Sequence, residues 1–303
     1  MRKVSYLVVL TVFALAGMAR AQEAAPAEEA PAPPADDAAA AAVPAPEAEA
    51  AAAPAAAPAA GTDYVSRGLT LSAGNLQVLV PIVLNLSKDA VLKPVWVPLD
   101  LRYGITDELE VFLNHGAIPG FPIATGFSGV CIGGEDRGCD KLYNNLNVGA
   151  QFSLLKDAAM ELAALGALAV ESLDPSTLSA VLGVNFKYLA GPVAIKAAPM
   201  ISIGATKRDA GNKEVIMVPV QVAFQATPEL AAFLDTGISG PVDGFGDGYL
   251  VPVGVGASFA VMPNLDVGGQ FMLPHVLAPS AVPDDLKGVN IRYLGVFAAW
   301  RLN

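Results

Sequence analysis

Long hydrophobic runs are scarce in this 303-residue chain, although 53% of its residues are hydrophobic. Beyond residue 76 every apolar stretch is interrupted by charge, proline or glycine before it reaches the length of about 18 residues that a membrane-spanning helix needs. Aromatic residues make up only 7% of the chain, whereas glycine and proline number 29 and 24. The sequence therefore argues against a bundle of spanning helices.

Basic residues are also scarce, with 18 Lys and Arg against 29 Asp and Glu and a formal net charge of −11. A nucleic-acid-binding chain gathers Lys and Arg on one face, and no such cluster occurs here. Zinc-finger spacing and a phosphate-binding loop are missing as well. We expect no nucleic-acid partner, no cofactor and no metal.

The first 21 residues form the one apolar run near the amino terminus. "MRK" is basic, "VSYLVVLTVFALAGMA" is apolar, and Ala19-Arg20-Ala21 is a small-x-small cleavage site. This pattern predicts a secretory signal peptide, residues 1–21, removed before Gln22. An uncleaved anchor is the alternative, but the run is short and ends in the cleavage signal.

Cysteine occurs only twice, at Cys131 and Cys139. An exported chain meets an oxidising compartment, so a disulfide between these two residues is the simple expectation. A metal site that adds nearby carboxylates such as Glu135 and Asp140 is the alternative. The spacing matches no metal motif, and we favour the disulfide.

Residues 22–60 consist almost entirely of Ala, Pro and acidic residues, with seven acids and no base. The segment lacks the large apolar side chains that a core needs, and its prolines prevent a long helix. We predict a disordered periplasmic spacer that acts as a tether. Contact of this arm with the cell wall is the alternative, and residues 61–75 are a lead-in to the next region.

From residue 76 onward, apolar and polar residues alternate with period two. In "LNVGAQF", Leu146, Val148 and Ala150 share one face, while Asn147 and Gln151 share the other. The predicted strands span residues 76–87, 93–103, 108–116, 142–154, 159–171, 177–189, 192–205, 214–225, 229–238, 249–261, 264–274 and 288–302. Most exceed the usual soluble strand of about 5–6 residues, and tilted strands of about 9–11 residues cross a bilayer.

Connections of two lengths alternate along this region. The short ones lie at residues 105–107, 155–158, 190–191, 226–228 and 261–264, and the longer ones at 88–92, 117–141, 172–176, 206–213, 239–248 and 275–287. An even strand number with tight turns on one side predicts an all-β fold, a transmembrane antiparallel up-and-down barrel of about 12 strands, over residues 76–303. Both termini then lie on the periplasmic, tight-turn side.

Turn length sets the expected register of the hairpins. Three-residue and two-residue loops place Arg102 opposite Glu110, Tyr188 opposite Val193, and Phe224 opposite Leu230. In each hairpin residues of the same face meet, as a sheet requires: Arg102 and Glu110 face inward, and the other two pairs face outward.

The hairpin "LRYGITDELEVFLNHG" (101–116) resembles a turn of poorly characterised porin-like bacterial outer-membrane barrels, including those labelled as phenol-degradation-pathway proteins. The shared elements are Arg102-Tyr103-Gly104, Thr106-Asp107 and Leu109-Glu110. The resemblance implies an outer-membrane location, with outer-membrane lipids and the barrel-assembly machinery as partners. Many such barrels end on an aromatic residue, whereas here the last aromatic residue is Trp300.

The strand phases predict which polar side chains face the barrel interior. They are Asp100, Arg102, Glu110, Glu161, Asn185, Lys187, Lys196, Gln221, Gln225, Asp235, Asp266, Gln270 and Arg292. Both charge signs occur, and facing opposites such as Arg102 and Glu110 suggest ion pairs. The set either lines a pore or fills the interior, and loop 117–141 either folds inward as a constriction or covers the mouth.

We favour a channel for passive diffusion of small solutes and expect no enzymatic activity. A structural or tethering barrel with a filled interior is the alternative. A lipid-modifying hydrolase that uses His115 or His275 is a third possibility, because both histidines fall at extracellular strand ends in the outward phase. No serine in the outward phase accompanies either histidine, and rim positions without catalytic duty are the simpler interpretation.

Overall fold

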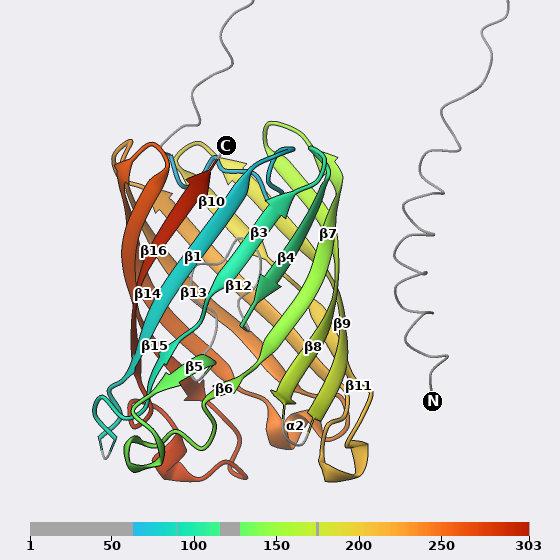
Figure 1. Cartoon of the computed structure of the whole chain (residues 1–303), viewed down its shortest axis with the longest axis vertical. Coiled ribbons are helices and arrows are strands. Elements are labelled where there is room, and N and C mark those ends of the chain that lie inside the picture. Colours follow the sequence, from blue (N-terminus) through green and yellow to red (C-terminus); the bar gives the residue numbers. More distant parts are fainter. Residues whose placement is uncertain (1–62, 89, 116–127, 174–175, 303) are drawn as a thin grey trace, which may run out of the picture. The chain divides into compact units, whose positions relative to one another are not determined.

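One antiparallel sheet closes on itself to form a barrel. The structure is a computed structural model that describes residues 63–88, 90–115, 128–173 and 176–302. The first strand, β1 (Leu76–Asn85), pairs with the last, β16 (Tyr293–Leu302), from Leu76 opposite Leu302 to Asn85 opposite Tyr293. Figure 1 shows these two strands side by side, and this pairing leaves the sheet without a free edge.

The remaining strands follow in sequence order around the wall. They are β2 (Val95–Val97), β3 (Asp100–Gly104), β4 (Leu109–Asn114), β5 (Gly129–Ile132), β6 (Tyr143–Asn144), β7 (Leu146–Lys156), β8 (Met160–Leu173), β9 (Ser176–Ala190), β10 (Val193–Ala197), β11 (Met200–Gly204), β12 (Val215–Gln225), β13 (Leu230–Pro241), β14 (Val251–Met262) and β15 (Leu265–Leu277). Short helices lie in the loops: η1 (Glu135–Arg137), η2 (Arg208–Ala210), α2 (Phe245–Gly248) and η3 (Asp284–Leu286).

The sixteen strand segments of the described chain make a barrel of twelve strands, as the alternation predicted, because four of these strands are each divided into two segments. The divided strands are β2 with β3, β4 with β5, β6 with β7, and β10 with β11. Pro98-Leu99 separates β2 from β3, and Ala198-Pro199 separates β10 from β11. Proline has no N–H to donate to the ladder, which explains both interruptions. The alanine-rich segment 159–171 is indeed a strand, β8. The sequence pattern missed β5, because β5 lies inside the predicted loop 117–141. In the structure β5 pairs with β2 on one side and with β6 on the other.

The predicted hairpin register was wrong by two residues at each of the three turns. Arg102 lies opposite Phe112, Tyr188 opposite Ile195, and Phe224 opposite Ala232. The shift is even, so the inward and outward faces stay as the alternation predicted.

A shared turn chemistry contributes to this shift at two of these turns. The Thr106 hydroxyl accepts from the N–H groups of Glu108 and Leu109, and Thr227 does the same for Glu229 and Leu230. The threonine side chain thus stabilises a turn that is longer than the minimal loop. The sequence repeats accordingly as Thr-x-Glu-Leu.

The outer face of the barrel is apolar. Tyr103, Val111, Phe224, Leu234 and Phe259 are all exposed large hydrophobic residues. Along β3, Asp100, Arg102 and Gly104 are buried while Tyr103 is exposed, so polar side chains turn inward. No helix among the described residues is long and apolar enough to cross a membrane.

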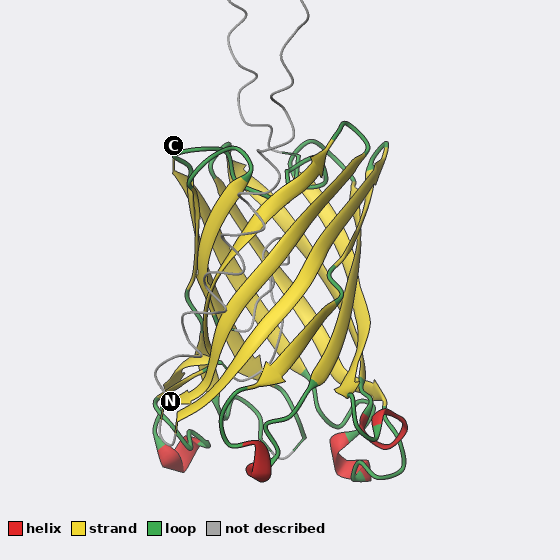
Figure 2. Ribbon diagram, turned by 90° about the vertical axis from the view of Figure 1, so that its right-hand side faces the viewer, coloured by secondary structure: helices red, strands yellow, loops and turns green. Residues whose placement is uncertain are grey.

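The two ends of the barrel differ, as Figures 1 and 2 show. Tight turns and the carboxyl terminus lie at one end, and the longer loops with η1, η2, α2 and η3 lie at the other. In transmembrane barrels the short turns are periplasmic and the longer loops are extracellular, so the tight-turn end is called the periplasmic end and the long-loop end the extracellular end.

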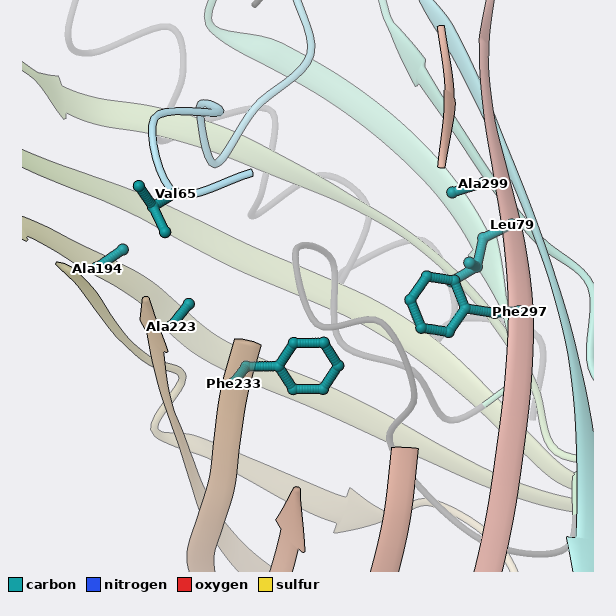
Figure 3. Close-up of a cluster of buried hydrophobic side chains, with 7 residues drawn as sticks. All are labelled: Val65, Leu79, Ala194, Ala223, Phe233, Phe297 and Ala299. Carbon is teal, nitrogen blue, oxygen red and sulfur yellow. The ribbon is translucent and has the colours of Figure 1, made fainter. Parts of the chain in front are cut away.

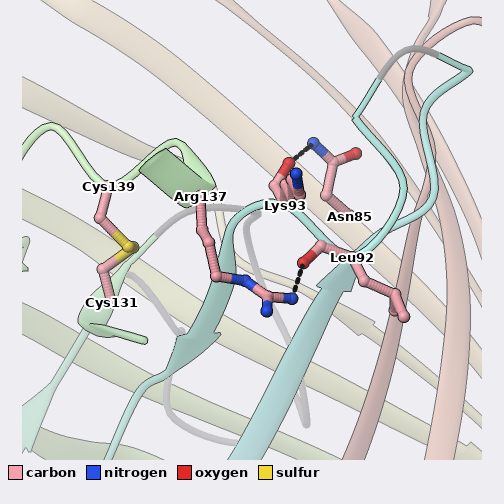
Figure 4. Close-up of a disulfide and its surroundings, with 6 residues drawn as sticks. All are labelled: Asn85, Leu92, Lys93, Cys131, Arg137 and Cys139. Carbon is pink, nitrogen blue, oxygen red and sulfur yellow. Dashed lines mark hydrogen bonds between the residues drawn. A yellow bond between two sulfur atoms is a disulfide. The ribbon is translucent and has the colours of Figure 1, made fainter. Parts of the chain in front are cut away.

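The predicted disulfide is present at the long-loop end, between Cys131 and Cys139 (Figure 4). It packs with buried Val83, Trp96 and Tyr293. Beside it, the Arg137 guanidinium donates to the Leu92 carbonyl at 3.3 Å. The cysteine-metal alternative is therefore wrong, because each sulfur is bonded to the other.

We expect a charge placed on the outer face to destabilise the barrel according to its depth. Leu234→Arg, near the middle of β13, should lower the free energy of unfolding by about 2–4 kcal/mol. Leu230→Arg, at the periplasmic end of the same strand, is the matched control and should cost about 0–1 kcal/mol. Denaturant titration in phospholipid vesicles measures both, and equal costs would contradict a membrane-facing wall.

Candidate functional site

The segment that precedes β1 enters the barrel and fills its periplasmic half. We call residues 63–74 the plug segment. Val65 and Leu69 are only 1% and 3% exposed, although neither belongs to a strand. The lead-in segment 61–75 had no structural role in the sequence-based prediction, so this placement is a new feature of the site.

Apolar contacts hold the beginning of the plug segment. Val65 belongs to one buried apolar cluster with the inward-facing Ala194 of β10, Ala223 of β12 and Phe233 of β13 (Figure 3). Both alanines are fully buried, and their small side chains leave room for Val65. The Tyr64 ring stacks on Phe233 with a centroid distance of 6.0 Å. Burial of a valine side chain of this kind contributes about 1.5–3 kcal/mol.

Wall side chains accept hydrogen bonds from the N–H groups of the plug segment. Leu69 N donates to Glu161 Oε2 at 2.7 Å, and Leu71 N donates to Glu110 Oε2 at 2.8 Å. Val65 N donates to Gln225 Oε1 at 3.2 Å. Buried N–H groups that do not join a ladder thereby find partners.

Other wall side chains donate to the carbonyl groups of the same segment. The Leu69 oxygen accepts from Arg102 Nη2 and from Gln151 Nε2, each at 2.5 Å. The Arg67 oxygen accepts from Lys187 Nζ at 2.7 Å. The wall therefore bonds the main chain of the segment from several strands at once.

Ion pairs neutralise the charges that this arrangement buries. Arg102 Nε lies 2.8 Å from Glu110 Oε1, and Lys187 Nζ lies 3.0 Å from Glu161 Oε1. The Asp266 carboxylate, 2% exposed, pairs with two arginines, Arg67 of the plug segment and Arg301 of β16. A buried charge is tolerated only when it is paired and hydrogen-bonded, and each of these carboxylates meets that condition.

Most of the side chains predicted to face inward meet at this site. The seven that contact the plug segment by hydrogen bond or ion pair are Arg102, Glu110, Glu161, Lys187, Gln221, Gln225 and Asp266. Gln221 accepts from the Tyr64 hydroxyl at 3.0 Å, and Lys196 Nζ lies 4.5 Å from the centre of the Tyr64 ring.

The remaining inward side chains support these contacts from behind or lie elsewhere. Asp235 accepts from the amides of Gln221 and Gln270, and Asn185 donates to Gln151 at 2.7 Å. Two residues, Asp100 and Arg292, are apart from the group. Asp100 accepts from the backbone N–H of His115 at 2.9 Å.

Arg292 is the second residue outside the group. It precedes β16 at the long-loop end, where its Nε donates to the Leu86 carbonyl at 2.7 Å.

The sequence-based prediction missed four members of the site, Tyr64, Arg67, Gln151 and Arg301. Gln151 was assigned to the inward face of its strand, and the alternation therefore carried a signal for it. Tyr64 and Arg67 lie in the non-periodic plug segment, where alternation gives no information. Their partners Gln221 and Asp266 are 157 and 199 residues away in sequence.

The two histidines do not share one environment. His115 is 5% exposed, and its ring accepts from Leu99 N–H at 3.2 Å while its Nε2 lies 2.6 Å from the Tyr143 hydroxyl. The sequence placed His115 in the outward phase at the rim, whereas in the structure its side chain is buried and packs against Tyr143 of β6. His275 Nδ1 lies 2.8 Å from the Leu286 carbonyl at the extracellular end.

A cavity of about 540 Å³ lies at the long-loop end, between the wall and the loop that joins β11 to β12. Its lining consists of Glu171, Thr177, Ser202, Lys207, Ala210, Gly211, Asn212, Lys213, Val215 and Met217. Asn212 Nδ2 donates to the carbonyls of Leu178 and Thr206, at 2.9 and 2.7 Å, and this fixes the loop over the strand ends.

The same loop carries an exposed ion pair between Arg208 and Glu214, with nitrogen and oxygen 2.7 Å apart. The hydrogen bond from Arg208 lowers the pKa of the Glu214 carboxyl. Within the described residues, no group of three His, Cys, Asp or Glu side chains is arranged to hold a metal ion.

Comparison with known proteins identifies the fold. No family model and no curated protein matches the sequence. Among solved structures, the NanC porin superimposes with a TM-score of 0.55 at 7% identity, over 74% of this chain and 100% of that chain.

Two further structures have similar coverage. The KdgM porin gives a TM-score of 0.51 at 5% identity, over 75% of this chain and 99% of the porin. An outer-membrane channel from Pseudomonas putida F1 gives 0.49 at 13% identity, over 77% and 97%. The likenesses to the NanC and KdgM porins establish that the chain has the fold of bacterial outer-membrane porins.

We expect chemical labelling to reveal the plug segment, since both native cysteines form the disulfide. Val65→Cys should react slowly with a membrane-impermeant maleimide, because this position is buried in the barrel. The neighbouring Ser66→Cys is the matched control and should react fast, because Ser66 is exposed. Stopped-time labelling with mass spectrometry measures both rates, and similar rates would contradict the placement of the segment.

Proposed function

We propose that this protein is an outer-membrane channel for passive diffusion of small solutes, and that the plug segment narrows its periplasmic half. One observation supports this most strongly. The plug segment is held by side-chain hydrogen bonds, ion pairs and apolar packing, and the wall behind it is closed independently by β1 and β16. Movement of the segment therefore leaves the wall intact.

The rest of the chain fits this role. We propose that residues 1–21 are removed as a signal peptide and that residues 22–60 form a periplasmic spacer that leads into the plug segment. The polar side chains predicted from the strand phases, apart from Asp100 and Arg292, line the passage in its periplasmic half. The cavity of about 540 Å³ is the extracellular entrance.

A second candidate function has a specific observation in its favour. The predicted lumen residues are mostly buried, with Glu110 and Gln221 at 0% exposure, and this degree of filling also suits a structural or tethering barrel. The two candidates differ in whether the plug segment yields during transport. In a structural barrel the plug segment would stay in place, and no solute would pass along the inward-facing side chains.

An enzymatic function has less support than either candidate. The His115 ring is occupied by Leu99 N–H and the Tyr143 hydroxyl, and His275 Nδ1 lies against a backbone carbonyl. A general base must reach the proton that it removes from a nucleophile or a water molecule. We therefore propose that neither histidine is catalytic.

Single-channel recording in planar bilayers tests the channel. Arg67→Ala removes the ion pair with buried Asp266, and we expect it to increase the frequency and size of conductance steps because the plug segment is held less firmly. Arg208→Ala is the matched control, since Arg208 pairs with Glu214 on the exposed extracellular surface. Its trace should equal that of the unmodified protein.

Two outcomes would count against the channel. One is the lack of steps from both the unmodified protein and Arg67→Ala at several voltages. The other is an equal change in both variants, which would indicate a general effect of losing an arginine. Heat-modifiable migration on a denaturing gel confirms that each variant is folded before it is measured.

A further inference from the structure

The wall contacts the plug segment mainly through main-chain atoms. Four N–H groups of the segment, those of Val65, Leu69, Leu71 and Ala73, donate to side chains of the barrel. Two carbonyl oxygens, those of Arg67 and Leu69, accept from three barrel side chains. Main-chain recognition of this kind depends little on which side chains the bound segment carries, because every peptide offers the same groups.

The carboxylates that accept these N–H groups are already held in place by the wall. Glu161 uses Oε1 for Lys187 and Oε2 for Leu69 N–H. Glu110 uses Oε1 for Arg102 Nε and Oε2 for Leu71 N–H. Lys187 and Arg102 belong to the barrel, so the positions of the two carboxylates do not depend on the plug segment. Such preorganisation lowers the entropic cost of binding a ligand.

Two side-chain subsites add selectivity to this main-chain recognition. Ala194, Ala223 and Phe233 form an apolar pocket for Val65. Asp266 accepts two hydrogen bonds from the guanidinium of Arg67, which follows Val65 by two residues. A bidentate arginine–carboxylate pair is stronger and geometrically more specific than a neutral hydrogen bond.

We infer that the periplasmic half of the barrel is a peptide-binding site. It takes a short peptide that bears an apolar residue followed two positions later by arginine, and residues 65–73 of the chain itself occupy it in this structure. The inference deepens the proposed function, on which it rests for its biological meaning, because it assigns short peptides as the solute class. The binding itself is measurable without any conductance.

The test uses the full-length chain with a protease site inserted between Gly74 and Asn75. Ser72, Ala73 and Gly74 are exposed, and a side chain built at Gly74 would contact nothing within 4 Å. The protein therefore folds with its plug segment attached, and the cut then frees the segment from β1. The probe is a fluorescein-labelled synthetic peptide of residues 63–74, DYVSRGLTLSAG, followed by fluorescence anisotropy in detergent.

We expect the cut protein to bind the labelled peptide saturably and the uncut protein not to bind it, because the attached segment holds the site. A peptide methylated on the nitrogens of Leu69 and Leu71 should bind at least about tenfold more weakly, since it lacks both N–H donors to carboxylates. A peptide in which alanine replaces the exposed Ser66 and Ser72 should bind as the parent does.

Two results would overturn the inference. One is the lack of binding to the cut protein after the protein has been immobilised and the released native segment has been washed away with detergent buffer. The other is equal affinity for the parent and N-methylated peptides, which would show that the wall does not recognise the main chain. Binding without conductance would refute the channel and leave the peptide site in place, so the two proposals fail separately.

Discussion

The pairing of β1 with β16 is the constraint on which the rest of the structure depends. Inside a bilayer no water is available for backbone N–H and C=O groups, so a sheet is stable there only when its first and last strands join. Ten residue pairs, from Leu76–Leu302 to Asn85–Tyr293, achieve this here. Closure in turn fixes which side chains meet lipid and which face inward.

Closure also creates an interior that must be filled or wetted, and the plug segment meets this requirement in the periplasmic half. Inward-facing carboxylates such as Glu110 and Glu161 would be costly to bury alone. Each is paired with a cation of the wall and bonded to an N–H group of the segment. The same contacts that stabilise the barrel interior thus place a peptide chain across the passage.

The sequence was sufficient to predict the wall and insufficient to predict what fills it. Period-two alternation depends on local side-chain direction, so it identified even the alanine-rich β8 and the inward position of Glu161 and Lys187. Hairpin register depends on turn chemistry, and the predicted pairs were wrong by two residues at three turns, with Thr106 and Thr227 hydroxyl contacts contributing at two of them.

The plug segment was beyond reach of the same reasoning because it has no period and its partners are distant in sequence. Leu69 binds Glu161, 92 residues away, and Arg67 binds Asp266, 199 residues away. Inward-facing alanines such as the fully buried Ala194 and Ala223 were a local hint, since small inward residues leave space for another chain. The assignments for residues 1–62 and for loop residues 116–127 lie outside the described part of the chain.

Engineered disulfide cross-linking tests the placement of the plug segment most directly. Val65 packs against Ala194, whereas the next residue, Ile195, faces outward from the same strand. The double variant Val65→Cys/Ala194→Cys should form a cross-link under mild oxidation, detectable by mass spectrometry, and Val65→Cys/Ile195→Cys should not. Failure of the first pair to form, or equal yield from both pairs, would contradict a plug segment inside the barrel.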